Sequence, residues 1–108
     1  MNYTDDQIAD IGEEIIKVLK TVYDPEIPVD IYELGLIYDV QISEEGNVKV
    51  VMTLTTPNCP VAESLPAEVR EKVENVEGVN LVDLELTFEP SWHKDMMSEE
   101  AKFELGML

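Results

Sequence analysis

The sequence predicts an α+β fold: a two-layer sandwich in which two helices cover one face of a three-stranded sheet. Segments with helical spacing and segments that alternate with a period of two follow one another as helix, strand, strand, helix, strand, with a short C-terminal helix after them. Each element has one apolar face, and packing the two helices on the sheet buries all of these faces. The 108 residues fit a single domain (1-108), with a core of about 5-92 and a C-terminal tail, 93-108.

The first helix is predicted over about Asp5 to Val22, where apolar residues recur at helical spacing. Thr4 is expected to open it with a capping box, because its hydroxyl can accept from the backbone three residues on while Gln7 reaches back. The segment Asp24-Pro25-Glu26-Ile27-Pro28 must end it, since each proline lacks an N–H and disfavours helix in the residue before it. A compact loop follows, with one helical turn at residues 31–34.

The strands are predicted from strict alternation of apolar and polar residues. Residues 44–47 form the hairpin turn between the first two strands, because Gly46 and Asn47 tolerate a positive φ. The inward-facing residues are expected to be Leu36, Tyr38, Val40 and Ile42 in the first strand, Val48, Val50, Met52 and Leu54 in the second, and Val82, Leu84, Leu86 and Phe88 in the third.

The second helix is predicted between the second and third strands. Pro60 suits its first position, Pro66 should bend it or mark its true start, and Gly78 is expected as its C-cap. If the two strands run parallel, the crossover between them should be right-handed. The C-terminal helix is predicted from Ser98 to Leu105, with Ser98 as its N-cap.

Charge and cysteine content narrow the function. Asp and Glu number 24 against 7 Lys and Arg, and the formal net charge of −17 makes nucleic acids and anionic membranes poor partners. No apolar run approaches the length of a membrane span, and the N-terminus lacks signal-peptide features, so we expect a soluble, cytoplasmic protein. A single cysteine excludes an internal disulfide and a four-cysteine metal cage in one chain, and it fits a reducing compartment.

Cys59 is the most informative candidate site residue. It follows a predicted strand and precedes a predicted helix, and thiol pKa values fall at a helix N-terminus, where the thiolate can bind metal or attack an electrophile. Thr55 and Thr56 could donate to a thiolate or sulfide, and Pro60 completes the loop. The alternatives are a buried cysteine that packs as a small hydrophobe and threonines that satisfy the loop backbone.

Three further features invite a chemical interpretation. Asp24 and Glu26 flank a proline and could ligate a metal or receive a partner's lysine, whereas Asp24 could equally cap the turn through its side chain. His93, the only histidine, could serve as a base for a Cys59 nucleophile, although it could equally be a surface or packing residue. Trp92 is expected to fasten the tail to the body of the domain.

Four segments together carry a resemblance to a known family. They are Asp24-Pro25-Glu26-Ile27-Pro28-Val29-Asp30-Ile31, Leu34-Gly35-Leu36-Ile37-Tyr38, Met52-Thr53-Leu54-Thr55-Thr56-Pro57-Asn58-Cys59-Pro60 and Leu86-Thr87-Phe88-Glu89-Pro90 with Trp92. With them the chain resembles the SufT/PaaD-like domain family of iron–sulfur cluster assembly proteins. The resemblance implies an α+β fold, a non-catalytic role in maturing iron–sulfur proteins, Cys59 as the functional cysteine and Asp24 with Glu26 as an acidic turn. It also implies assembly scaffolds or client proteins as partners.

The chemistry of clusters limits what Cys59 can do alone. A cluster takes about four protein ligands, usually thiolates. The chain has one thiol, so a cluster would bridge two chains, for example in a homodimer, or Cys59 would be a metal ligand for a transient iron–sulfur cluster during transfer. Two alternatives remain: a thiol enzyme that carries a persulfide or acyl group, and an acidic interaction module with a merely structural cysteine.

Overall fold

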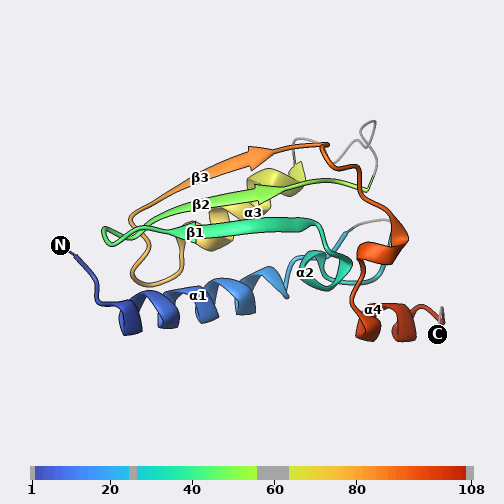
Figure 1. Cartoon of the computed structure of the whole chain (residues 1–108), viewed down its shortest axis with the longest axis horizontal. Helices are drawn as coiled ribbons and strands as arrows, with labels where there is room; N and C mark the ends of the chain where they lie inside the picture. Colours follow the sequence, from blue (N-terminus) through green and yellow to red (C-terminus); the bar gives the residue numbers. More distant parts are fainter. Residues whose placement is uncertain (1, 25–26, 56–63, 107–108) are drawn as a thin grey trace.

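The structure is a computed structural model that describes residues 2–24, 27–55 and 64–106 (Figure 1). Its elements are α1 (Asp5–Leu19), α2 (Ile31–Leu34), β1 (Ile37–Ile42), β2 (Asn47–Met52), α3 (Ser64–Glu74), β3 (Leu81–Leu86), a 3-10 turn η2 (Lys94–Met96) and α4 (Glu99–Glu104). The predicted α+β class and the order of elements are confirmed. No helix in these ranges combines the length and apolarity that a membrane span requires.

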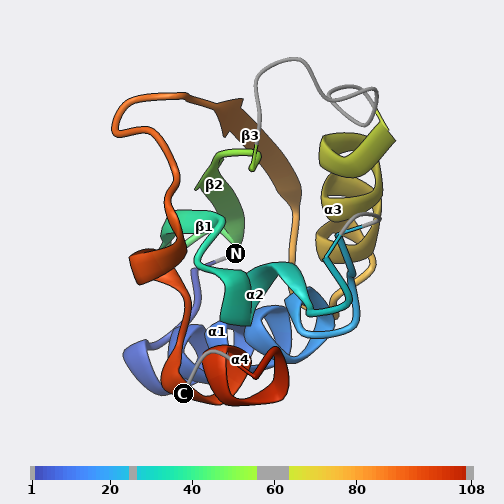
Figure 2. The ribbon, with the colours of Figure 1, turned by 90° about the vertical axis from the view of Figure 1, so that its right-hand side faces the viewer.

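The sheet has the order β1-β2-β3 within the described residues, with β1 and β2 antiparallel and β2 and β3 parallel. Both long helices lie on one side of it, as the end-on view in Figure 2 shows. Val48, Val50 and Met52 of β2 are buried beneath the helices. The opposite face is polar, and there Lys49 pairs with Glu85 across the two parallel strands at 3.8 Å.

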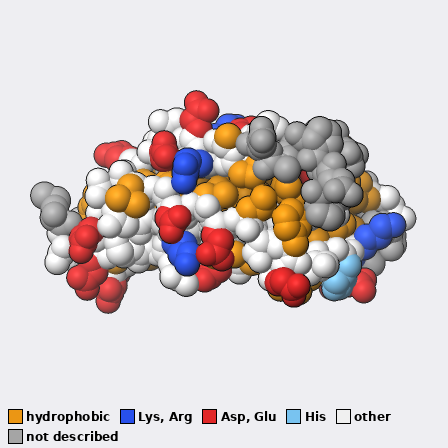
Figure 3. All heavy atoms as spheres, turned by 90° about the horizontal axis from the view of Figure 1, so that it is seen from above, with side chains coloured by type: hydrophobic (Ala, Val, Ile, Leu, Met, Phe, Trp, Pro, Cys, Tyr) orange, Lys and Arg blue, Asp and Glu red, His pale blue; other side chains and the backbone are white. Residues whose placement is uncertain are grey.

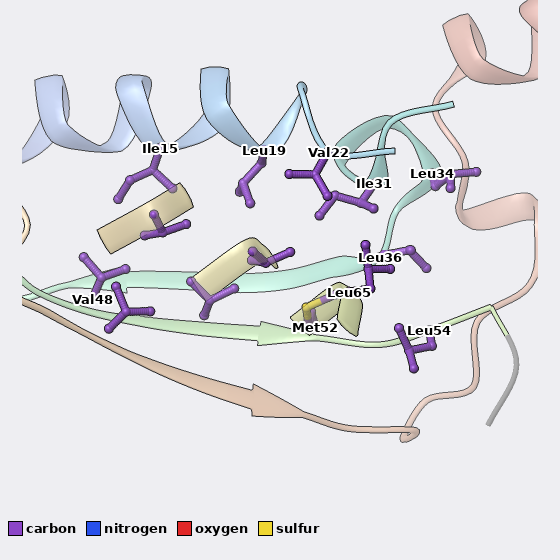
Figure 4. Packing of buried hydrophobic residues seen from close by; sticks show 14 of the residues in the cluster. Ile15, Leu19, Val22, Ile31, Leu34, Leu36, Val48, Met52, Leu54 and Leu65 are labelled. Atoms are coloured by element: carbon purple, nitrogen blue, oxygen red, sulfur yellow. The ribbon is translucent and has the colours of Figure 1, made fainter. Parts of the chain in front are cut away.

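The core lies between the helices and the sheet (Figure 4). Ile11, Ile15 and Leu19 give α1 its buried face, and α3 contributes Leu65, Val69 and Val73. These spacings of three and four residues put each set on one side of its helix, so burying them docks both helices on the sheet.

The first helix begins as predicted and ends three residues early. Gln7 N donates to Thr4 Oγ1 at 3.2 Å and Thr4 N donates to Gln7 Oε1 at 2.8 Å, which completes the capping box. The helix ends at Leu19 because the chain then pairs with a later segment: Tyr23 bridges to Asp30.

The predicted alternation of β1 is wrong at Tyr38. Ile37 pairs with Met52 and Asp39 pairs with Val51, so Tyr38 is an extra residue opposite no partner, a β-bulge. Ile37 consequently packs on the core, and the Tyr38 hydroxyl donates to Pro90 O at 2.7 Å.

Two predicted ends also differ from the structure. α3 ends at Glu74, so Gly78 is not its C-cap; Gly78 has φ +96° in a later turn, where an added Cβ would lie 2.9 Å from the Ile11 side chain. β3 ends at Leu86, and Thr87 Oγ1 accepts from Glu89 N at 3.2 Å, which turns the chain and leaves Phe88 36% exposed instead of buried.

The two predictions about helix starts have different outcomes. Pro66 is expected either to bend the helix or to mark its true start, and it lies in the first described turn of α3, which agrees with the second alternative. Pro60 lies outside the described residues. α4 begins as predicted, since Ala101 N donates to the Ser98 hydroxyl at 3.1 Å.

Candidate functional site

The structure describes two of the predicted site residues, Asp24 and Thr55. Thr56, Cys59, Pro60 and Glu26 lie outside the described residues. The position of Cys59 at a helix N-terminus and the ionisation of its thiol therefore stay predictions. What the structure adds is the geometry of the segments on either side.

Two buried leucines mark where the cysteine-bearing connection leaves and re-enters the core. Leu54, just after β2, is 2% exposed, and Leu65, in the first described turn of α3, is 3% exposed. Both belong to the cluster around Met52 that Figure 4 labels. Thr55 is half-buried after Leu54. The core therefore fixes both ends of the connection.

Thr53 is a buried polar residue that the sequence did not single out. Its N–H donates to Leu36 O at 2.8 Å, continuing the pairing of β1 with β2. Its side chain is completely buried, and the hydroxyl has no hydrogen-bond partner among the described residues. A buried hydroxyl without a partner lowers the stability of the fold. The alternating pattern of the strand does not predict the burial of Thr53, because it places this residue on the solvent-facing side.

Asp24 is 4% exposed and shapes its own turn. Its Oδ1 accepts from Ile27 N at 3.1 Å, while Asp24 N donates to Val29 O at 3.4 Å. This geometry supports the alternative in which the carboxylate caps the turn. A contact between this turn and a metal or a partner's lysine stays a prediction.

The C-terminal segment crosses the α2–β1 junction and is fastened there. Trp92 Nε1 donates to Leu34 O at 2.7 Å, which confirms the predicted role of Trp92. Further along, Ser98 N donates to Glu33 O at 2.9 Å. Gly35, with φ +81°, lies so close to the Met96 carbonyl that a Cβ would collide with it. We call residues 89–98 the tail strap.

His93 has a structural contact within the tail strap. Its Nδ1 accepts from Asp95 N at 3.3 Å and caps the 3-10 turn η2. This contact supports the interpretation of His93 as a surface residue that shapes the tail.

The described flanks of both predicted chemical segments lie at the same end of the molecule. Figure 1 shows the C-terminal ends of α1 and β2, the start of α3 and the tail strap together on the right. The C-terminal ends of α1 and β2, which precede Asp24 and Thr55 in the chain, thus lie at one end of the domain. Within residues 2–24, 27–55 and 64–106, no three His, Cys, Asp or Glu side chains are grouped to hold a metal ion.

Residues 12–101 match a protein family described as "Iron-sulfur cluster assembly protein". The chain belongs to this family. It is 60% identical, over 89% of its length and 91% of the relative's, to the "Fe-S protein maturation auxiliary factor" of Porphyromonas gingivalis. It is also 39% identical to the "Fe-S protein maturation auxiliary factor YitW" of Bacillus subtilis, over 90% of this chain and 95% of the relative.

Solved structures confirm the family fold. A "Domain of Unknown Function DUF59" from Bacillus anthracis superposes with a TM-score of 0.84 at 36% identity, covering 93% of this chain and 95% of the other. A conserved hypothetical protein from Thermotoga maritima gives a TM-score of 0.75 at 45% identity, covering 87% of this chain and 92% of the other. The family resemblance predicted from the four sequence segments is thus confirmed.

Proposed function

We propose that this protein is a non-catalytic auxiliary factor in the maturation of iron–sulfur proteins, and that Cys59 contacts iron or a cluster transiently. The main support is its similarity to the Porphyromonas gingivalis maturation factor, which is 60% identical and matches over nearly the full length of both chains. Similarity of this extent leaves no large additional domain in the relative to account for its role.

The cluster is cargo in this proposal. Because the chain has one cysteine, it can supply about one of the four thiolates that a cluster usually takes. An assembly scaffold, a client protein or a second copy in a homodimer would supply the others. Such incomplete coordination favours transfer over storage, and a reduced thiol persists in the cytoplasm, which is the compartment we propose.

Two features of the described residues support this use of the loop. The core holds Leu54 and Leu65 at its two ends, so the connection starts and ends at fixed points. The C-terminal end of α1, which precedes Asp24 in the chain, lies at the same end of the molecule (Figure 1). The net charge of −17 also favours partners with a basic surface.

The decisive experiment replaces the chromosomal copy in a host that needs this protein. Deleting the gene should lower the activity of a [4Fe–4S] dehydratase while its polypeptide level stays constant. Cys59→Ser should reproduce the deletion, and the matched control Ser64→Ala, an exposed exchange at the first described residue of α3, should restore activity. Full activity with Cys59→Ser would reject the role of the cysteine, whereas an unaffected deletion strain would reject the maturation role itself.

Two measurements on purified protein separate the chemical alternatives. Anaerobic protein should carry substoichiometric iron and sulfide that disappears with Cys59→Ser, and cluster bridging would appear as a dimer that dissociates on iron removal. A thiol enzyme instead predicts an alkylation rate whose inflection lies well below the ordinary thiol pKa of about 8.5. If Cys59→Ser leaves the activity of the client enzyme unchanged but neutralising acidic surface residues lowers it, the interaction module is favoured.

A further inference from the structure

We propose that the outer edge of β3 binds an extended, basic segment of a partner protein, which adds to the sheet as a fourth strand. This surface and the chemistry of its partner are separate from the maturation role. It does not depend on Cys59.

The first support is that β3 ends the sheet. β3 pairs with β2 on one side, and no strand in the described ranges pairs with its other side. Thr87 N donates to Met52 O at 2.9 Å, so the odd-numbered residues direct their backbone groups toward β2. In a parallel ladder this direction alternates, and the N–H and C=O groups of Leu84 and Leu86 therefore point away from the sheet. An added strand binds to such a row of groups.

The second support is a groove beside this edge, which has apolar and charged side chains in its lining. The groove lies between β3 and α3 and is lined by Leu84 together with Pro66, Ala67, Arg70, Glu71 and Glu74 of α3. Leu84 and Leu86 are half-buried, and Phe88 beyond the strand is 36% exposed. Figure 3 looks down on this edge and shows apolar side chains gathered over the C-terminal half of β3, with acidic side chains nearby. Every second side chain of an added strand would enter this groove.

The third support is charge. Asp83 and Glu85 are exposed on the opposite face of β3, where the intervening side chains of an added strand would lie. Lys49 neutralises Glu85 only weakly, because the pair is 3.8 Å long and exposed on both sides. The complementary segment therefore alternates apolar residues with Lys or Arg. A second copy of this chain would set Asp83 and Glu85 against acidic residues of its own β3, which favours a different protein as partner.

The other sheet edge is less suited to this binding. The bulge at Tyr38 interrupts the row of backbone groups on β1, and bulges commonly block edge pairing. The Tyr38 hydroxyl is engaged by Pro90 of the tail strap. On the polar face of β1, Asp39 already accepts from the Gln41 amide at 2.8 Å. β3, in contrast, pairs with β2 in an unbroken register from Leu81 to Leu86.

The test uses the full chain and a labelled peptide of about eight residues in which lysine and valine alternate, long enough to span β3. Fluorescence anisotropy should show saturable binding that weakens between about 50 mM and about 300 mM salt. Two probes isolate the strand geometry: a peptide of the same composition with its lysines and valines in two blocks, and the alternating peptide with every second backbone nitrogen methylated. Both should bind at least about tenfold more weakly, because the block peptide loses register and the methylated one loses donors.

Charge reversal on the protein isolates the surface. The double variant Asp83→Lys with Glu85→Lys should lose about tenfold in affinity for the lysine–valine peptide and should gain binding of a glutamate–valine peptide. The matched control, Glu13→Lys with Glu14→Lys on the exposed face of α1, changes the net charge equally and should bind the lysine–valine peptide as the parent does. No binding of the alternating peptide, equal binding of the block or methylated probe, or an equal loss in the α1 variant would each overturn the proposal. Cys59→Ser should leave this binding unchanged, so its outcome is separate from that of the maturation role.

Discussion

Replacing Gly35 with alanine should loosen the tail strap, and the size of the effect follows from the structure. Gly35 has φ +81°, a left-handed conformation that costs an L-residue about 1–2 kcal/mol. The added Cβ would also collide with the carbonyl group of Met96, whose carbon would lie 3.0 Å away. The strap must then shift, which strains the hydrogen bonds from Trp92 to Leu34 and from Ser98 to Glu33 at about 1 kcal/mol each.

The total expected loss for Gly35→Ala is therefore about 3–4 kcal/mol, a large part of the 5–15 kcal/mol that stabilises a typical domain. Urea unfolding measures it, and the midpoint should fall by roughly 1–3 M. Trp92 is the only tryptophan and donates to the residue next to Gly35, so its emission maximum should shift to longer wavelength in the folded variant.

Gly106 supplies the matched control. It has φ +73°, and a Cβ added there would meet no described atom within 4 Å, so Gly106→Ala carries the conformational cost without the collision. Its unfolding midpoint should fall less than that of Gly35→Ala, and the Trp92 emission should stay unchanged. Equal midpoints for the two variants, together with unchanged emission in both, would refute the packing of the strap on Gly35.

Exchanges at three further positions test individual contacts by urea unfolding. Thr53→Val removes a buried hydroxyl that has no hydrogen-bond partner among the described residues, and it keeps the shape of the side chain, so stability should rise by about 1–2 kcal/mol; a loss of that size would show that the hydroxyl has a partner. Asp24→Asn keeps an oxygen that can accept from Ile27 N, whereas Asp24→Ala removes it and should cost about 2 kcal/mol more; equal losses would contradict the capping role. Thr4→Ala should cost about 1 kcal/mol and Thr4→Ser little, and an insensitive Thr4→Ala would argue against the capping box.

Periodicity predicts an element correctly when the segments that bury it all pack on the same face. β2 is buried beneath both helices, so its alternation from Val48 to Met52 is unbroken in the structure. The starts of α1 and α4 are predicted correctly because Thr4 and Ser98 are recognisable N-cap residues. Each side chain accepts from the backbone N–H three residues further on. Such signals are local, and the sequence contains them in full.

The errors arise where a distant segment decides the local structure. Alternation directs Tyr38 inward because it contains no information about Pro90, whose carbonyl accepts from the Tyr38 hydroxyl 52 residues away along the chain. Helical spacing extends α1 to Val22 because it contains no information about the pairing of Tyr23 with Asp30. The absence of a described partner for the Thr53 hydroxyl is likewise a property of the packed interior around it.

The residues in the four segments that resemble the family can likewise be divided into those with a structural role and those with a chemical one. Leu34 and Gly35 receive the tail strap, and Trp92 fastens it, so these residues have sufficient structural reasons for their identity. Asp24 shapes its own turn. Substitutions at these positions will therefore change stability together with function, and a loss of function there does not by itself indicate lost chemistry. At Cys59, the conservative exchange to serine distinguishes a loss of chemistry from a loss of stability, provided that the unfolding midpoint is measured on the same variant.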